Sequence, residues 1–234
     1  MEPSKVDSIF ADVGRGGSEV SVVIECAGHR LEGELVVPPR PIGIVLFAHG
    51  SGSSRLSPRN QQVAEALQQA GLATLLFDLL EEREAIDRRN VFDVELLAGR
   101  LTAAADWVGQ QPAVRKLPRG FFCASTGAAA ALIAAARSSQ SVSAIVSRGG
   151  RPDLAEAWLE QVVAPTLLIV GGEDDQVIEM NRSALALLRC PTRLEVVPGA
   201  THLFEEPGAL EEVARLAVEW FTAHLGEPTD SYEG

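Results

Sequence analysis

The feature that most constrains the fold is an alternation of short apolar runs with longer amphipathic segments. Five runs are almost continuously apolar, which is typical of strands buried on both faces of a parallel sheet. They are "IVLFAHG" (44–50), "ATLLFDLL" (73–80), "GFFCAS" (120–125), "SAIVSRGG" (143–150) and "PTLLIVGG" (165–172), and "RLEVVPGA" (193–200) is expected to add a last strand. Two earlier runs, "EVSVVIEC" (19–26) and "RLEGELVVP" (30–38), alternate apolar and polar residues instead. We expect these two to be antiparallel strands with one exposed face.

The segments between these runs have the spacing of amphipathic helices. We expect helices over residues 59–70, 91–108, 126–137, 153–161, 179–188 and 207–225. Strands that alternate with helices imply right-handed crossovers, and therefore an α/β fold with a mostly parallel, doubly wound sheet. The sheet should hold about eight strands, with the first two antiparallel, and should be flanked by about six helices.

The chain shows no internal repeat, low-complexity block or linker that would divide it. We therefore predict one domain over residues 1–234, with loose termini at 1–18 and 226–234. The connections between the predicted elements are short and leave no room for a large lid domain. The longest candidate cover is "DLLEEREAIDRRN" (78–90), a charged stretch that is more typical of a solvated loop or short helix than of a substrate gate.

Charge and cysteine content argue against several classes of partner. The 234-residue chain has a formal net charge of −12, which disfavours DNA or RNA as a partner. Its three cysteines, Cys26, Cys123 and Cys190, show neither zinc-ligand spacing nor a disulfide framework, which indicates a reducing compartment. The N-terminus lacks the apolar region of a secretory signal, and the longest apolar stretches are too short to span a bilayer. We expect a soluble, cytoplasmic protein with no membrane partner.

Two potential nucleophiles, Cys123 and Ser125, lie in "GFFCASTGAAAALIAAA" (120–136). A nucleophile elbow is a sharp, strained turn from a strand to a helix, and it needs small residues two positions before and two after the nucleophile. Around Ser125 these residues are Cys123 and Gly127, whereas around Cys123 the first of them is the bulky Phe121. Cys123 also falls inside the apolar strand. The pattern favours Ser125 as the nucleophile and Cys123 as a buried packing thiol.

A serine hydroxyl needs a base, and the chain has four histidines. His202, in "PGATHLFEEPG", follows the last predicted strand, so it can face the C-terminal edge of the sheet, where ligands bind in parallel α/β proteins. The positions of His29 and His224 are more typical of surface residues. His49, in "AHGSGSS", is more typical of a residue that shapes its glycine-rich loop.

The base in turn needs an acid that orients it and stabilises its protonated form. The stretch "VGGEDDQVIEMN" supplies two acids, Asp174 and Asp175, directly after a buried strand. The spacing Gly171-x-x-Asp174-x-x-Val177 places the acid in the turn and returns the valine to the core. Asp174 is therefore favoured, and Asp175 is the alternative.

Developing negative charge on the reacting carbonyl oxygen needs preorganised N–H donors. The backbone N–H of Thr126, directly after Ser125 and at the start of a predicted helix, is one candidate. The loop after "FAHG" should supply the second, from Ser51 or alternatively from Gly52.

With these motifs in place, the sequence resembles the α/β-hydrolase superfamily, and within it the dienelactone-hydrolase-like branch. The stretches that carry the resemblance are "LFAHGSGSSRLSPRN", "GLATLLFDLL", "ASTGAAAAL", "VSRGGRPDLA", "PTLLIVGGEDD" and "GATHLFEEPGALEEVA". The chain order Ser…Asp…His is the one expected on such a sheet. The resemblance implies a Ser125–Asp174–His202 triad that acts on an ester or related acyl bond.

Two departures from the family pattern bear on the substrate. Dienelactone hydrolases use a cysteine at the elbow, whereas the matching residue here is Ser125, which favours a general carboxylesterase over an enzyme for dienelactone itself. The residue two positions before the nucleophile is Cys123, where the superfamily usually has glycine. We expect this cysteine to tighten the elbow without abolishing it.

The sequence gives fewer indications of the substrate. Arg148 and Arg59 are candidates to bind an anionic group of a small acyl substrate, and a structural ion pair or helix cap is the alternative for both. Nothing in the sequence calls for a metal or an organic cofactor. An acyltransferase or thioesterase on the same triad, or a non-catalytic binding protein with this fold, remains open, as does the choice between monomer and homo-oligomer.

Overall fold

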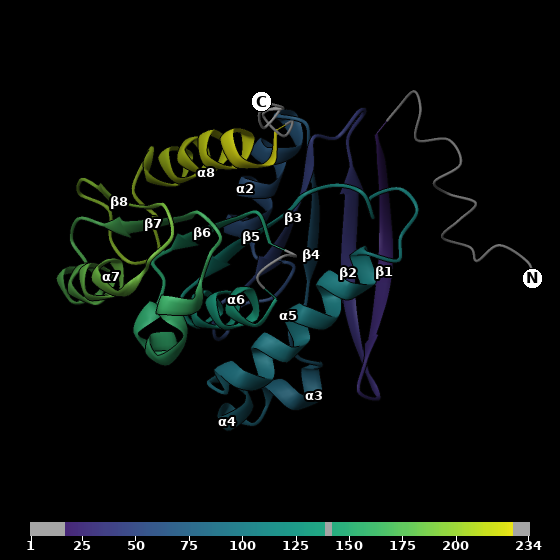
Figure 1. Ribbon diagram of the computed structural model, residues 1–234, viewed down its shortest axis with the longest axis horizontal. Coiled ribbons are helices and arrows are strands. Elements are labelled where there is room, and N and C mark those ends of the chain that lie inside the picture. Colours follow the sequence, from purple (N-terminus) through teal and green to yellow (C-terminus); the bar gives the residue numbers. More distant parts are fainter. Residues whose placement is uncertain (1–16, 139–141, 227–234) are drawn as a thin grey trace, which may run out of the picture.

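An eight-stranded sheet crosses the part of the computed structural model that is described, residues 17–138 and 142–226 (Figure 1). Its strands are β1 (Ser18–Cys26), β2 (His29–Val37), β3 (Gly43–Ala48), β4 (Leu72–Phe77), β5 (Arg119–Ala124), β6 (Ala144–Arg148), β7 (Thr166–Gly171) and β8 (Thr192–Val197). The spatial order is β1-β2-β4-β3-β5-β6-β7-β8. β2 pairs antiparallel with both β1 and β4, and the remaining pairs are parallel. The predicted fold class is confirmed.

In the described part of the chain, six main helices flank the sheet, as predicted, and two single-turn helices are added to them. The main ones are α2 (Pro58–Gln69), α5 (Val94–Val108), α6 (Thr126–Arg137), the 3₁₀ helix η2 (Pro152–Gln161), α7 (Asp175–Leu187) and α8 (Ala209–Leu225). Helices α2 and α8 cover one face, and α5, α6 and η2 cover the other (Figure 1). Among the described residues no helix has both the length and the apolar character needed to cross a bilayer.

The sequence placed several element boundaries differently from the structure. The helix expected over 91–108 is two helices, α4 (Arg88–Val91) and α5, because the Asp93 side chain accepts a hydrogen bond from the Leu96 N–H and starts a new helix there. The charged stretch 78–90 forms the short helix α3 (Glu82–Ala85) and the start of α4. The prediction of a loose terminus over residues 1–18 is wrong at Ser18, because Ser18 pairs with Val37 in β1. Residues 1–16 and 227–234 lie outside the described residues.

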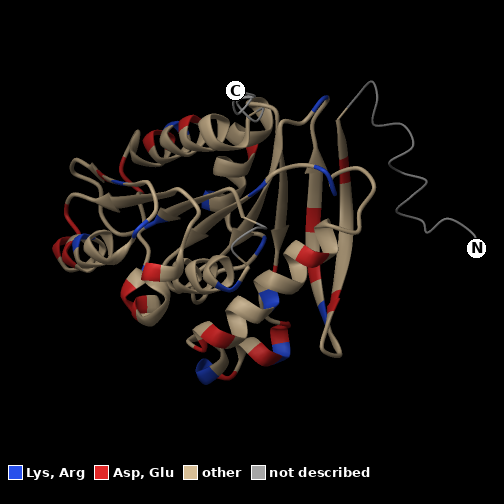
Figure 2. Ribbon diagram, in the orientation of Figure 1, with Lys and Arg blue, Asp and Glu red and all other residues tan. Residues whose placement is uncertain are grey.

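The parallel strands are buried on both faces, which explains their continuous apolar sequence. Every residue of β3, β4, β6 and β7 is buried, whereas β1 alternates buried and exposed positions. Ten of the twelve residues of α6 are buried, and its alanines let it pack between α5 and η2. Acidic residues lie instead on outer elements, with the helices α8, α7, η2 and α3 and the strands β1 and β2 among them (Figure 2). The turns after β3, β5, β7 and β8 therefore meet at one edge of a rigid sheet.

Candidate active site

Ser125 stands at a strained turn between β5 and α6. Its φ of 49° and ψ of −125° lie in a region that residues with a side chain rarely adopt. The Ser125 carbonyl accepts hydrogen bonds from the backbone N–H of Ala128 at 3.1 Å and of Arg151 at 3.0 Å. These two bonds hold the turn in its strained form, as a nucleophile elbow requires.

Two glycines make room for this turn. A Cβ on Gly127 would lie 2.2 Å from the Ala48 carbonyl oxygen, which no substitution can relieve without moving backbone. A Cβ on Gly50 would lie 2.8 Å from the Ser125 Cβ. The small residue predicted after the candidate nucleophile is thus needed because α6 starts in contact with the end of β3.

Cys123, the other potential nucleophile, is fully buried in β5. Its thiol donates a hydrogen bond to the Val146 carbonyl over 3.2 Å, and burial raises the pKa of the Cys123 thiol to about 12. A thiol in this state carries almost no thiolate at neutral pH and has no access to a substrate. The structure agrees with the prediction that Cys123 is a packing residue.

His202 and Asp174 are joined by a hydrogen bond, with 2.6 Å between His202 Nδ1 and Asp174 Oδ2. Because a carboxylate oxygen accepts, the proton lies on Nδ1 and leaves Nε2 free to act as a base. Asp174 precedes α7 as its N-cap, while Asp175 is its exposed first residue. A Cβ on Gly171 would lie 2.4 Å from the Ala200 carbonyl oxygen, so this glycine lets the two turns approach. Of the two acids left open by the sequence, Asp174 is the one that contacts His202.

The loop that carries His202 is braced by a residue that sequence analysis missed. Glu206 accepts hydrogen bonds from the Thr201 N–H at 3.0 Å and from the Thr201 hydroxyl at 2.6 Å. These bonds hold the pKa of the Glu206 carboxyl below its usual value of 4.5. Phe204, buried and with a φ of 55°, fixes the same loop from the core side. A bond spanning five residues in an irregular loop has no signature in the sequence.

His49 shapes the loop expected to supply an oxyanion-hole donor. Its Nδ1 donates to the Gly50 carbonyl at 3.0 Å, and its Nε2 accepts from the Leu79 N–H at 3.1 Å. Burial lowers the pKa of His49 below its usual 6.5, so the ring is neutral and both bonds are satisfied. With both ring nitrogens occupied, His49 has the structural role predicted for it. The Gly50 carbonyl is held toward His49, immediately before the Ser51 N–H.

A second anchor of this loop, Arg55, was not foreseen. The Arg55 N–H donates to Asp78 Oδ1 at 2.7 Å, and its guanidinium forms an ion pair with the same carboxylate. The guanidinium also contacts the exposed carboxylate of Glu32 at 2.6 Å. The loop after β3 is thereby tied to the end of β4.

A cavity of about 630 Å³ lies at this edge of the sheet and brings the candidate residues together. It is lined by Ser125, His202, Ser51, Arg59 and Arg148, together with the other loop residues of 50–54 and 56–58, Ala124 and Leu203. Thr126, the other oxyanion-hole candidate, begins α6 beside Ser125, where the first-turn N–H groups have no partner within the helix. None of the described residues that line this cavity is acidic, although the chain has a net charge of −12.

Arg148, at the end of β6, is nine-tenths buried and has no ion pair with a carboxylate among the described residues. Its Nη2 donates to Asn60 Oδ1 at 3.4 Å, its Nε has no partner, and its guanidinium lies 6.0 Å from the Phe204 ring centre. Burial, with the charge of Arg59 nearby, lowers the pKa of Arg148 to about 10. Arg59 is more exposed and pairs with Glu205 at 3.2 Å. The expected structural ion pair is thus found for Arg59 and not for Arg148.

A comparison with solved structures shows the family. A dienelactone hydrolase from Anabaena variabilis, known from a crystal structure, is 56% identical, with a TM-score of 0.87 over 90% of this chain and 99% of that one. The chain belongs to the dienelactone-hydrolase branch of the α/β-hydrolase superfamily. The esterase domain of a Rhodothermus marinus protein shares the fold, with 22% identity and a TM-score of 0.72 over 89% of this chain and 100% of that one. No family model matches the chain.

Among curated proteins, a dienelactone-hydrolase relative in Mycobacterium tuberculosis carries a different name. It is called "Putative phosphoribosyl transferase" and is 58% identical over 216 residues, or 91% of this chain. The match covers 48% of that protein, so the chain spans about half the length of the curated relatives it matches.

Proposed function

We propose that this chain is a serine hydrolase that cleaves a carboxylic ester, or a related acyl bond, of a small substrate through an acyl-enzyme on Ser125. The observation that carries the proposal is the 2.6 Å hydrogen bond between His202 and Asp174, at the mouth of a cavity that Ser125 also lines from its strained turn. Residues at the ends of strands keep fixed positions because the sheet is rigid, and a catalytic site needs such fixed positions.

In the proposed reaction, His202 Nε2 takes the proton of the Ser125 hydroxyl as its oxygen attacks the carbonyl carbon. The carbonyl electron pair moves to oxygen, where the N–H groups of Ser51 and Thr126 stabilise the negative charge. Asp174 stabilises the protonated ring of His202 through Nδ1. His202 then gives its proton to the leaving oxygen as the bond to the acyl group breaks. Water repeats the sequence, which releases the acid and frees Ser125.

The lining of the cavity supports a substrate that carries an anionic group. Arg148 is buried in it without a carboxylate partner, and a buried cation without a counter-charge is costly. Arg59 lines the same cavity, although its charge is partly compensated by the ion pair with Glu205. We assign both residues to recognition of that group, with Arg148 as the main contact.

The test uses p-nitrophenyl acetate and a fluorophosphonate probe with the wild-type chain, Ser125→Ala and a control, Ser21→Ala on the exposed side of β1. Ser125→Ala should lower kcat by at least about a thousandfold and abolish labelling, because the nucleophile is gone. Ser21→Ala should match wild type. Hydrolysis that persists in Ser125→Ala would reject the proposal, and an unlabelled wild type would favour the non-catalytic alternative. Products formed with added alcohols or thiols would reveal an acyltransferase or thioesterase.

A further inference from the structure

A second and larger cavity, of about 1240 Å³, adjoins the one that holds Ser125. The two share the loop residues Gly50, Ser51, Gly52, Ser53, Ser54 and Leu56. The larger cavity reaches the candidate oxyanion hole, since Thr126 and Ser51 both line it. Its outer wall is formed by the single-turn helices α3 and α4. A substrate held at the oxyanion hole can therefore extend into either cavity.

The chemistry of the proposed function distinguishes the two directions. His202 must protonate the leaving oxygen, so the leaving group lies on the side of His202. His202 and Leu203 line the smaller cavity and do not line the larger one. The larger cavity is lined by His49 and Thr126 but not by His202, so it is the direction left for the acyl part of an ester.

The lining of the larger cavity differs in charge from that of the smaller. Its four arginines, Arg30, Arg55, Arg83 and Arg88, are balanced by the four acids Glu32, Asp78, Glu81 and Glu82. Its floor is apolar, with Leu79, Leu80 and Leu97 buried, and the half-exposed ring of Phe92 stands in its wall. Such a cavity favours a neutral group with an apolar body.

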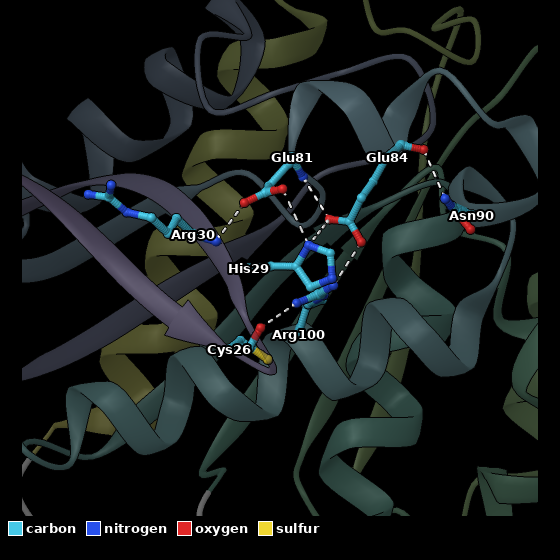
Figure 3. Close-up of polar contacts among 7 residues, drawn as sticks. All are labelled: Cys26, His29, Arg30, Glu81, Glu84, Asn90 and Arg100. Atoms are coloured by element: carbon cyan, nitrogen blue, oxygen red, sulfur yellow. Dashed lines mark hydrogen bonds and ion pairs between the residues drawn. The ribbon is translucent and has the colours of Figure 1, made fainter.

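The wall of this cavity is held in place by a polar cluster around α3 (Figure 3). Glu81 and Glu84 form a capping box, and His29 Nδ1 lies 3.3 Å from Glu81 Oε2 and 3.4 Å from Glu84 Oε2. The buried guanidinium of Arg100 contacts Glu84 Oε1 at 2.8 Å and the Cys26 carbonyl at 2.8 Å. These contacts fasten α3 to the turn between β1 and β2 and to α5, and so anchor the wall of the cavity.

We propose that the cavity beneath α3 and α4 is the acyl-binding subsite, and that it accepts a neutral acyl group larger than acetyl. This inference rests on the proposed function. It assigns the acyl chain and the anionic group to separate cavities, with the anionic group on the leaving-group side beside Arg148.

The test places a large side chain in the cavity through Ala85→Trp, with Ile86→Trp as the matched control. Both residues are exposed, but Ala85 lines the cavity and Ile86, which is 80% exposed, does not. The measured quantity is kcat/KM for p-nitrophenyl octanoate divided by kcat/KM for p-nitrophenyl acetate. Wild type should prefer octanoate, and Ala85→Trp should lower the ratio about tenfold or more, since displaced methylenes lose binding in the transition state. Ile86→Trp should leave the ratio unchanged.

Three outcomes would overturn the inference. If wild type hydrolyses acetate but Ala85→Trp leaves the ratio as it was, the cavity does not bind the acyl chain and the proposed function stands. If Ala85→Trp instead lowers kcat/KM for 1-naphthyl acetate more than for phenyl acetate, the cavity binds the leaving group. If wild type hydrolyses none of these esters, the proposed function fails and the acyl subsite fails with it.

Discussion

The Arg148 guanidinium donates a hydrogen bond to the side-chain oxygen of Asn60 over 3.4 Å, where a buried arginine ordinarily meets a carboxylate. A neutral amide leaves the positive charge of Arg148 largely uncompensated beside Ser125 and His202. This uncompensated charge predicts a measurable preference for substrates that carry an anionic group.

Arg148→Gln should lower kcat/KM for 4-acetoxybenzoate about tenfold to a hundredfold, because a hydrogen bond to a charged group contributes about 1.5–3 kcal/mol. Methyl 4-acetoxybenzoate, which has the same acyl group and no charge, should be affected far less. Arg182→Gln, on the exposed side of α7, is the control and should change neither substrate. An equal loss on the charged and the neutral ester would remove Arg148 from anion recognition.

Asp78→Asn should lower kcat with little change in KM for any ester. The change weakens the anchor that Arg55 provides and loosens the loop carrying the Ser51 N–H, and we expect a loss of about tenfold, below that for complete removal of an oxyanion-hole donor. The matched control is Glu32→Gln, which breaks only the more exposed pair with Arg55 and should stay within about twofold of wild type. If both variants behave alike, the loop does not depend on Asp78.

Cys123→Ala should retain hydrolysis within about threefold of wild type while lowering the free energy of unfolding by about 1 kcal/mol, a usual cost for a core substitution. Alkylation of the native chain followed by mass spectrometry should modify Cys26 and Cys190, which are partly exposed, and leave Cys123 untouched. A Cys123→Ala variant as inactive as Ser125→Ala would show that the nucleophile has been misassigned.

The stability of the chain should fall as the pH drops below about 6.5, in part because of His49. Its pKa in the folded state is below the usual value of 6.5, so in this range the unfolded chain binds more protons than the folded one. The free energy of unfolding therefore rises with pH between the folded and unfolded pKa values, and it levels off above them. In urea denaturation from pH 5 to 7.5, the free energy of unfolding should depend less steeply on pH for His49→Gln than for wild type. The difference in slope should correspond to up to about one bound proton. An unchanged slope would place a charged His49 in the fold.

The strands and the elbow could be predicted because each follows from local composition. Continuous apolar runs identified β3 to β7, and the small residue Gly127 distinguished Ser125 from Cys123. The sequence favoured Asp174 over Asp175 without deciding between them, because both lie in one turn and only the position of His202 separates them.

What the sequence did not predict depends on contacts between distant segments. Arg55 meets Asp78 across 23 residues, and Arg148 meets Asn60 across 88. The break between α4 and α5 depends on the Asp93 side chain capping a new helix inside a stretch whose spacing is helical throughout. The cavity beneath α3 was missed because a charged stretch with little periodicity gives no sign of the hollow that it encloses.

Among the residues that the structure describes, the two cavities share only residues 50–54 and Leu56 of the loop, and their walls are otherwise separate. Residues of α3 and α4 can therefore be exchanged during evolution without disturbing the turn that carries Ser125, and residues around Arg148 can change without altering α3. Under the proposed function, a scaffold divided in this way can acquire a new acid component of its ester substrate while keeping the alcohol component, or the reverse. Divergence among relatives should accordingly be concentrated in one wall at a time.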